Sequence, residues 1–178
     1  MFYITIMIYI ILKQMKQLLY HSCSINEMVN IMKHGAIIPL FDDDEYVISL
    51  TRNKRLLYDE HCGYGKALFM FCVDKTILQY NTKVVPYNWF DTKHNTKHKY
   101  IEPPHEALFA LDHTLYKFET EERIYKKIPI TSRALISLQI DMARFLSDTQ
   151  THPELVEILD WLNSPFIATF CEMNVVWV

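Results

Sequence analysis

The sequence has few glycines, no closely paired cysteines and no apolar run of membrane-spanning length, and each shortage excludes a class of protein. Only 3 of its 178 residues are glycine, whereas 50% are hydrophobic and 13% are aromatic. A chain of this composition is neither disordered nor fibrous. Its length predicts one domain, residues 1–178, with enough volume for a buried core.

The cysteines and the net charge exclude two further classes of site. The four cysteines are widely spaced and form no Cys-x-x-Cys pair: Cys23, Cys62, Cys72 and Cys171. This usage is typical of reduced cysteines in an intracellular protein, and it does not predict a zinc site or any other metal site. The formal net charge of -3 provides no overall basic field for nucleic acid.

The longest apolar run, residues 1–12, is shorter than the roughly 20 residues that cross a bilayer. No basic residue precedes it and no small-residue cleavage site follows it, so we do not interpret it as a signal peptide. Its isoleucine, tyrosine and threonine content favours a buried strand. We therefore expect a cytoplasmic protein with no membrane partner.

A strand followed by a well-defined helix is predicted near the N-terminus. The strand covers residues 16–23 and ends in His21, Ser22 and Cys23. Ser24 is placed to cap the helix, and Glu27 completes a capping box. Gly35 supplies the left-handed position at the helix end. The apolar residues of one helical face are Ile25, Met28, Val29, Ile31 and Met32.

The rest of the chain alternates short strands with few helices. We predict strands over residues 46–52 and 66–74, and an extended edge segment that contains Pro86. Asp74 is placed to cap a short helix, and Thr151 to cap a helix that reaches residue 163. A further strand is expected at 133–141. This order predicts a single α+β domain.

Three groups of residues have side chains suited to catalysis, and each has a simpler structural interpretation. His21 and Ser22 lie at a strand-to-helix junction, where a histidine more often makes a structural hydrogen bond. The segment with Ser49, Thr51 and Arg52 also fits a strand that ends in a solvated arginine. The third group, Glu119, Glu121 and Glu122, also fits a charged surface stretch.

The order of these groups resembles the ADP-ribosyltransferase family. "LLYHSCS…IMKHG" is similar to its first strand and helix, "ISLTR" to its second strand, and "FETEERIYKKIPI" to the late strand that begins with the catalytic glutamate. Ser49-x-Thr51 and Glu119-x-Glu121 resemble motifs of the toxin-like branch. His21, Arg52 and a late glutamate also resemble the DarT-type enzymes that modify DNA. Small phage-encoded proteins share this layout, which would imply a viral origin and the host cytoplasm.

The resemblance implies a mixed or antiparallel split β-sheet with flanking helices, and NAD as the substrate. A carboxylate beside the NAD ribose would stabilise the positive charge that develops as nicotinamide leaves. Glu122 is the first choice, ahead of Glu121 and Glu119. In an extended segment Glu119 and Glu121 share one face and Glu122 lies on the other, so only one face can line the pocket.

The resemblance also implies roles for the other candidates. His21 would bond a ribose hydroxyl, with Ser22 near the nicotinamide amide, Arg52 on a phosphate, and Ser49 and Thr51 beside them. We therefore expect His21, Arg52 and one glutamate around a single cleft, with the helix after Ser24 behind His21.

The leading hypothesis is an NAD-dependent mono-ADP-ribosyltransferase that acts on a protein or nucleic-acid acceptor. An NAD glycohydrolase and a catalytically inactive nucleotide- or partner-binding module of the same fold are the alternatives. The acceptor and the oligomeric state stay open at this point.

Overall fold

The structure is a computed structural model, which describes residues 17–42, 45–52, 67–86 and 121–178. Several sequence predictions fall outside the described residues. They concern the apolar run 1–12, Cys62, Glu119 and the extent of the single domain over residues 1–178.

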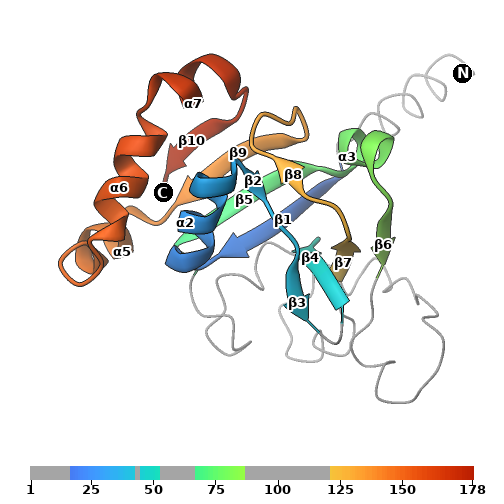
Figure 1. The fold of residues 1–178 in the computed structure, drawn as a ribbon, viewed down its shortest axis with the longest axis horizontal. Helices are drawn as coiled ribbons and strands as arrows, with labels where there is room; N and C mark the ends of the chain where they lie inside the picture. Colours follow the sequence, from blue (N-terminus) through green and yellow to red (C-terminus); the bar gives the residue numbers. More distant parts are fainter. Residues whose placement is uncertain (1–16, 43–44, 53–66, 87–120) are drawn as a thin grey trace, which may run out of the picture.

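The described segments form helices and short strands of an α+β fold, which confirms the predicted fold class (Figure 1). The strands are β1 (Leu18–Cys23), β2 (Ala36–Ile37), β3 (Leu40–Asp42), β4 (Glu45–Thr51), β5 (Phe69–Asp74), β6 (Val84–Pro86), β7 (Glu121–Ile124), β8 (Ile128–Pro129), β9 (Leu135–Ile140) and β10 (Asn174–Trp177). The helices are α2 (Ile25–His34), α3 (Lys75–Asn81), α5 (Met142–Asp148), α6 (Glu154–Leu162) and α7 (Pro165–Phe170).

The main sheet has the strand order β10-β9-β5-β1-β4-β7-β6, with β3 attached to β4. Strands β10 and β9 are parallel and the other pairs are antiparallel, so the sheet is mixed. β1 is paired with β5 along its full length, but with β4 only at Tyr20 and Thr51. The sheet is therefore split along a seam between β1 and β4. Figure 1 shows β3, β4, β7 and β6 on one side of this seam and β1, β5, β9 and β10 on the other.

Helix α2 follows β1 directly, because its first turn is stabilised by the predicted capping box. The Ser24 hydroxyl accepts from the Glu27 backbone N–H at 3.2 Å, and the Glu27 carboxylate accepts from the Ser24 N–H at 2.7 Å. Such a cap contributes about 1 kcal/mol. Gly35 ends the helix in the left-handed conformation (φ 60°), as predicted. The helix then packs against α6.

The central strand and the sheet edge also follow from the sequence. Every residue of β5 is buried, as expected of a continuous apolar strand. Asp74 caps α3 by accepting from the Ile77 N–H at 3.2 Å. Pro86 lies in β6, the edge strand of the sheet, where the missing N–H is tolerated.

One predicted cap is wrong, and three short elements were not predicted. Thr151 does not cap α6, which begins at Glu154 after Pro153 without a side-chain cap. The Thr151 hydroxyl and N–H instead both donate to the Asp148 carbonyl at the end of α5. The elements not predicted, α5, α7 and β10, are only 7, 6 and 4 residues long. At that length an apolar pattern is too short to be recognised.

Within the described ranges, no helix has both the length and the apolar character needed to cross a membrane. Among the described residues, Cys23, Cys72 and Cys171 form no disulfide bond.

Candidate active site

His21 lies in β1 beside the seam and is 9% exposed. Its Nδ1 is 2.9 Å from the backbone carbonyl oxygen of Ser49 in β4. Because a carbonyl can only accept, Nδ1 carries the hydrogen and Nε2 is left as an acceptor in the neutral ring. Burial lowers the pKa of His21, although the bond to Ser49 and the charge of Glu27 act in the opposite direction. The imidazole is therefore neutral at neutral pH.

Helix α2 lies behind this histidine, as expected. His21 shares a small cavity with Asn30 and Ile31 of α2 and with Leu40 of β3. Its neighbour Cys23 is buried, and burial raises the pKa of the Cys23 thiol well above its ordinary range. This cysteine is therefore protonated and is unsuited to act as a nucleophile.

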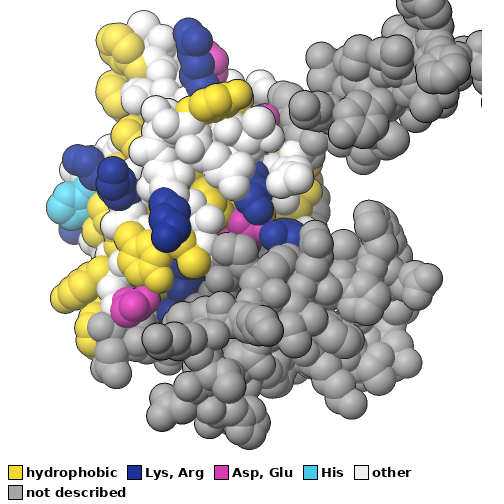
Figure 2. Space-filling model, turned by 90° about the vertical axis from the view of Figure 1, so that its right-hand side faces the viewer, with side chains coloured by type: hydrophobic (Ala, Val, Ile, Leu, Met, Phe, Trp, Pro, Cys, Tyr) yellow, Lys and Arg dark blue, Asp and Glu magenta, His cyan; other side chains and the backbone are white. Residues whose placement is uncertain are grey.

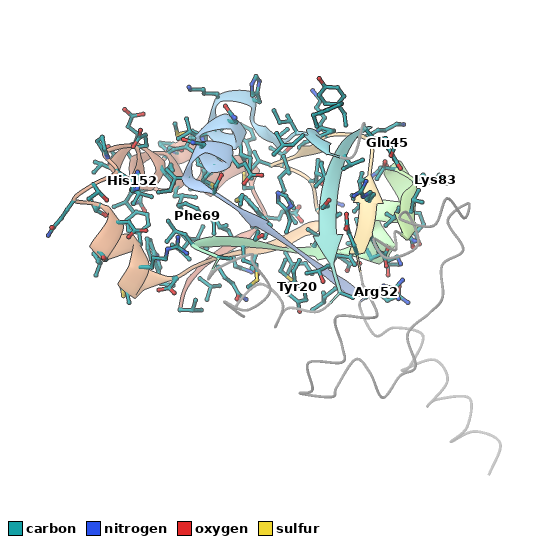
Figure 3. All side chains as sticks on the ribbon, turned by 90° about the horizontal axis from the view of Figure 1, so that it is seen from below. Tyr20, Glu45, Arg52, Phe69, Lys83 and His152 are labelled. Carbon is teal, nitrogen blue, oxygen red and sulfur yellow. The ribbon has the colours of Figure 1, made fainter. Side chains whose placement is uncertain are left out.

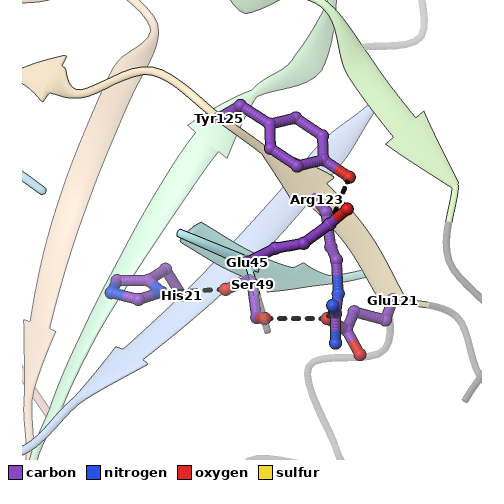
Figure 4. A network of polar contacts seen from close by, with 6 residues as sticks. All are labelled: His21, Glu45, Ser49, Glu121, Arg123 and Tyr125. Atoms are coloured by element: carbon purple, nitrogen blue, oxygen red, sulfur yellow. Dashed lines mark hydrogen bonds and ion pairs between the residues drawn. The ribbon is translucent and has the colours of Figure 1, made fainter. Parts of the chain in front are cut away.

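A hydrogen-bonded chain crosses the sheet from β1 to β7 (Figure 4). The Ser49 hydroxyl donates to Glu121 Oε1 at 2.7 Å, while the Ser49 carbonyl accepts from His21. Arg123 Nε donates to the same Glu121 oxygen at 2.8 Å. Arg123 lies two residues after Glu121 and therefore on the same face of β7. The chain joins His21, Ser49, Glu121 and Arg123 across the seam.

Glu122 belongs to a second cluster, on the opposite face of β7. Its Oε1 accepts from Arg52 Nε and from Lys75 Nζ, the latter at 2.6 Å. Glu122 is 0% exposed, and its Oε2 is buried without a hydrogen-bond partner among the described residues. Arg52 follows the last residue of β4, and Lys75 follows the last residue of β5. Figure 3 shows Arg52 and Glu45 at opposite ends of β4.

The structure thus divides the predicted site residues between two clusters. His21, Ser49 and Glu121 are joined directly, whereas Arg52 contacts Glu122 instead. Thr51 is paired with Glu121 in the sheet register. The remaining described candidate, Ser22, lies elsewhere. It borders a cavity of about 450 Å³ at the start of α2, together with Arg144 and His152.

Sequence reasoning missed two members of these clusters, Lys75 and Arg123. Both are basic residues within or directly after a buried strand, which is the signal that would have identified them. The interpretation of "ETEER" as a charged surface stretch is wrong for its described part, because Glu121, Glu122 and Arg123 are 9%, 0% and 1% exposed. Buried charges of this kind are retained where they are paired.

No group of His, Cys, Asp and Glu side chains in the described segments is arranged to hold a metal ion. On the face drawn in Figure 2, Lys and Arg side chains are dispersed among hydrophobic and acidic ones.

The comparisons with known proteins concern the fold. No protein-family model and no curated protein matches the chain. Two solved structures of DarT from Thermus sp. 2.9 are similar to it, each at 10% identity. The complex with NAD+ has a TM-score of 0.53 and covers 90% of this chain and 96% of DarT. The complex with ADP-ribosylated ssDNA has a TM-score of 0.55 and covers 92% of this chain and 94% of DarT.

The fold is of the ADP-ribosyltransferase type. This confirms the split sheet and flanking helices implied by the sequence resemblance. DarT and this chain share the fold over most of their lengths, although nine in ten aligned residues differ.

Proposed function

We propose that this protein is an NAD-dependent mono-ADP-ribosyltransferase. The observation that carries the proposal is the chain from His21 through Ser49 to Glu121, which spans the seam of an ADP-ribosyltransferase-type sheet. A surface salt bridge would explain none of its features: a neutral histidine, a serine used at both its carbonyl and its hydroxyl, and a nearly buried glutamate.

Glu121 is the carboxylate that would face the NAD ribose. Its side chain keeps 11% exposure, whereas that of Glu122 has none, so a ligand can reach Glu121 more readily. Cleavage of the bond between nicotinamide and ribose leaves positive charge on the ribose, and a fixed carboxylate stabilises that charge. Ser49 and Arg123 hold the carboxylate in one orientation before the substrate arrives.

His21 would bind a ribose hydroxyl. With Nδ1 committed to the Ser49 carbonyl, the Nε2 lone pair is the acceptor that remains. Lowering of the His21 pKa by burial keeps this lone pair unprotonated. Ser22 would lie near the nicotinamide amide, and Glu119 would orient or deprotonate the acceptor.

A nucleic-acid acceptor has support from one comparison: the DarT structure with a TM-score of 0.55 contains ADP-ribosylated ssDNA. We therefore propose single-stranded DNA as the first candidate acceptor of ADP-ribose and a protein as the second.

The test is release of nicotinamide from NAD by the purified protein, with and without single-stranded DNA. The wild type should release nicotinamide, and Glu121→Gln should lose roughly 100-fold or more of the rate. Glu172→Gln is the matched control, because Glu172 is 65% exposed and pairs only with Arg133 among the described residues. Release without transfer to DNA or protein would indicate an NAD glycohydrolase. Absence of both release and NAD binding would contradict the proposal and favour a binding module.

A further inference from the structure

Lys75 has no role in the chain from His21 to Glu121, yet it is a nearly buried cation. Its side chain is 10% exposed, and its ammonium group lies 2.6 Å from Glu122 Oε1. Burying a charged group is unfavourable unless it is paired and hydrogen-bonded, and the Glu122 carboxylate is the partner that meets this requirement for Lys75. Its backbone is also fixed, because the Lys75 N–H donates to the Gln17 carbonyl at 2.8 Å.

The arrangement around Glu122 is not the one that stability alone would select. Both cations bond to Oε1, while the buried Oε2 has no partner in the described part of the chain. Buried polar atoms are nearly always satisfied, and an exception requires an explanation. A pair of buried charges is moreover often no more stable than apolar residues of similar volume. This cluster therefore has features of a site kept for binding.

Arg52 is the member of the cluster that a ligand can reach, since its side chain is 24% exposed. It lies one residue beyond Thr51, which is paired with Glu121. Glu122 orients the Arg52 guanidinium, but a carboxylate alone would also cancel part of the attraction of Arg52 for an anion. Lys75 supplies a compensating positive charge at the same carboxylate oxygen.

We infer that Lys75 is a positioning residue that lets Glu122 orient Arg52 without neutralising it, so that Arg52 binds the diphosphate of NAD. This inference rests on the proposed function. The three side chains carry two positive charges and one negative charge. Arg52 would bind the phosphate through the hydrogen-bond donors of its planar guanidinium.

The experiment is calorimetric titration of the full chain with NAD at low and high salt. Lys75→Met should weaken NAD binding about tenfold at low salt and reduce its salt dependence, because one positive charge near the phosphate is lost. Lys75→Arg should restore the binding. Lys126→Met, at an exposed lysine, is the control and should leave the affinity unchanged.

Glu122→Gln removes the negative charge in place of a positive one. The Glu122→Gln variant should bind NAD at least as tightly as the wild type, which is the opposite of the effect expected for Lys75→Met. This variant tests the inference even if Lys75→Met does not fold. A purely structural Lys75 predicts a lower melting temperature with unchanged affinity. Our inference predicts weaker NAD binding whatever the change in melting temperature, because the loss of one partner of a buried ion pair lowers stability in either case.

Weaker NAD binding by Glu122→Gln, or wild-type affinity in Lys75→Met, would overturn the inference alone. A wild type that neither binds nor cleaves NAD would overturn the proposed function with it.

Discussion

Glu121 shares one oxygen between a serine hydroxyl and the guanidinium of Arg123, whereas Glu122 shares one oxygen between the two cations Arg52 and Lys75. The two residues are adjacent in β7, yet they face opposite sides of the strand. Glu121 is joined to His21 through Ser49 across the seam, whereas Glu122 is fully buried and pairs with Arg52, whose side chain is 24% exposed.

Under the proposed function, this difference corresponds to two roles for the neighbouring carboxylates. A carboxylate that must contact substrate has to stay partly accessible and be oriented by groups that do not block it. A carboxylate that only orients an arginine can be buried completely. Strand alternation places one residue of each kind at the start of the same strand.

The largest expected effect is on stability and distinguishes the two faces. Glu122→Ala should lower the free energy of unfolding by roughly 3–5 kcal/mol, because Lys75 loses its only charged partner among the described residues. Glu121→Ala should cost less, about 1–3 kcal/mol, since Arg123 makes a further interaction. Urea denaturation of the two variants measures the difference, and equal losses would contradict the proposed asymmetry.

The next effect is a pH dependence that comes from His21, which is joined to Glu121 through Ser49. The pKa of His21 is lowered in the fold, so the unfolded chain binds the proton more readily below about pH 6.5. Stability should therefore fall as the pH drops below that value, with a slope of at most about 1.4 kcal/mol per pH unit.

His21→Asn should remove this slope. His34→Asn, at an exposed histidine near the end of α2, is the control and should retain it. Unfolding measured between pH 7.5 and 5 tests the assignment, and a slope that survives in His21→Asn would refute it.

A smaller effect is expected from the link between the strands. Ser49→Ala removes the hydroxyl that holds Glu121 and should cost about 1 kcal/mol of stability. If the proposed function is correct, kcat should fall roughly tenfold with little change in KM, because the interaction orients a group used in the transition state. A change in KM alone would indicate that Ser49 serves binding instead.

The smallest effect is expected at the outer end of the same face. Tyr125 Oη donates to Glu45 Oε2 at 2.9 Å in an exposed position. Partial desolvation of this half-exposed tyrosine, followed by its hydrogen bond to Glu45, raises the pKa of Tyr125. Tyr125→Phe should change stability by only about 0.5 kcal/mol and leave nicotinamide release unaffected. A large loss of activity would extend the site beyond Arg123.

The sequence predicts the local parts of this structure well. The capping box of Ser24 and Glu27, the left-handed Gly35 and the buried β5 depend on residues close together in the chain, and all three predictions are confirmed. The alternation of Glu121 and Glu122 between faces also follows from strand geometry.

The long-range parts of the structure were not predictable in the same way. Lys75 contacts Glu122 across 47 positions and Ser49 contacts Glu121 across 72, and no local pattern encodes such register. From the sequence, Glu122 ranks ahead of Glu121, and that ranking stays untested. We propose Glu121 because of its greater exposure, which a sequence does not reveal. Thr151 does not cap α6 because its hydroxyl donates to the Asp148 carbonyl at the end of α5, a helix that was not predicted.

The most direct test of the central claim compares the rate of nicotinamide release by Glu121→Gln and Glu122→Gln in a single turnover at saturating NAD. The account predicts a loss of roughly 100-fold or more for Glu121→Gln and less than about tenfold for Glu122→Gln. The reverse order would show that the buried carboxylate contacts the ribose, and would contradict the division of labour between the two faces of β7.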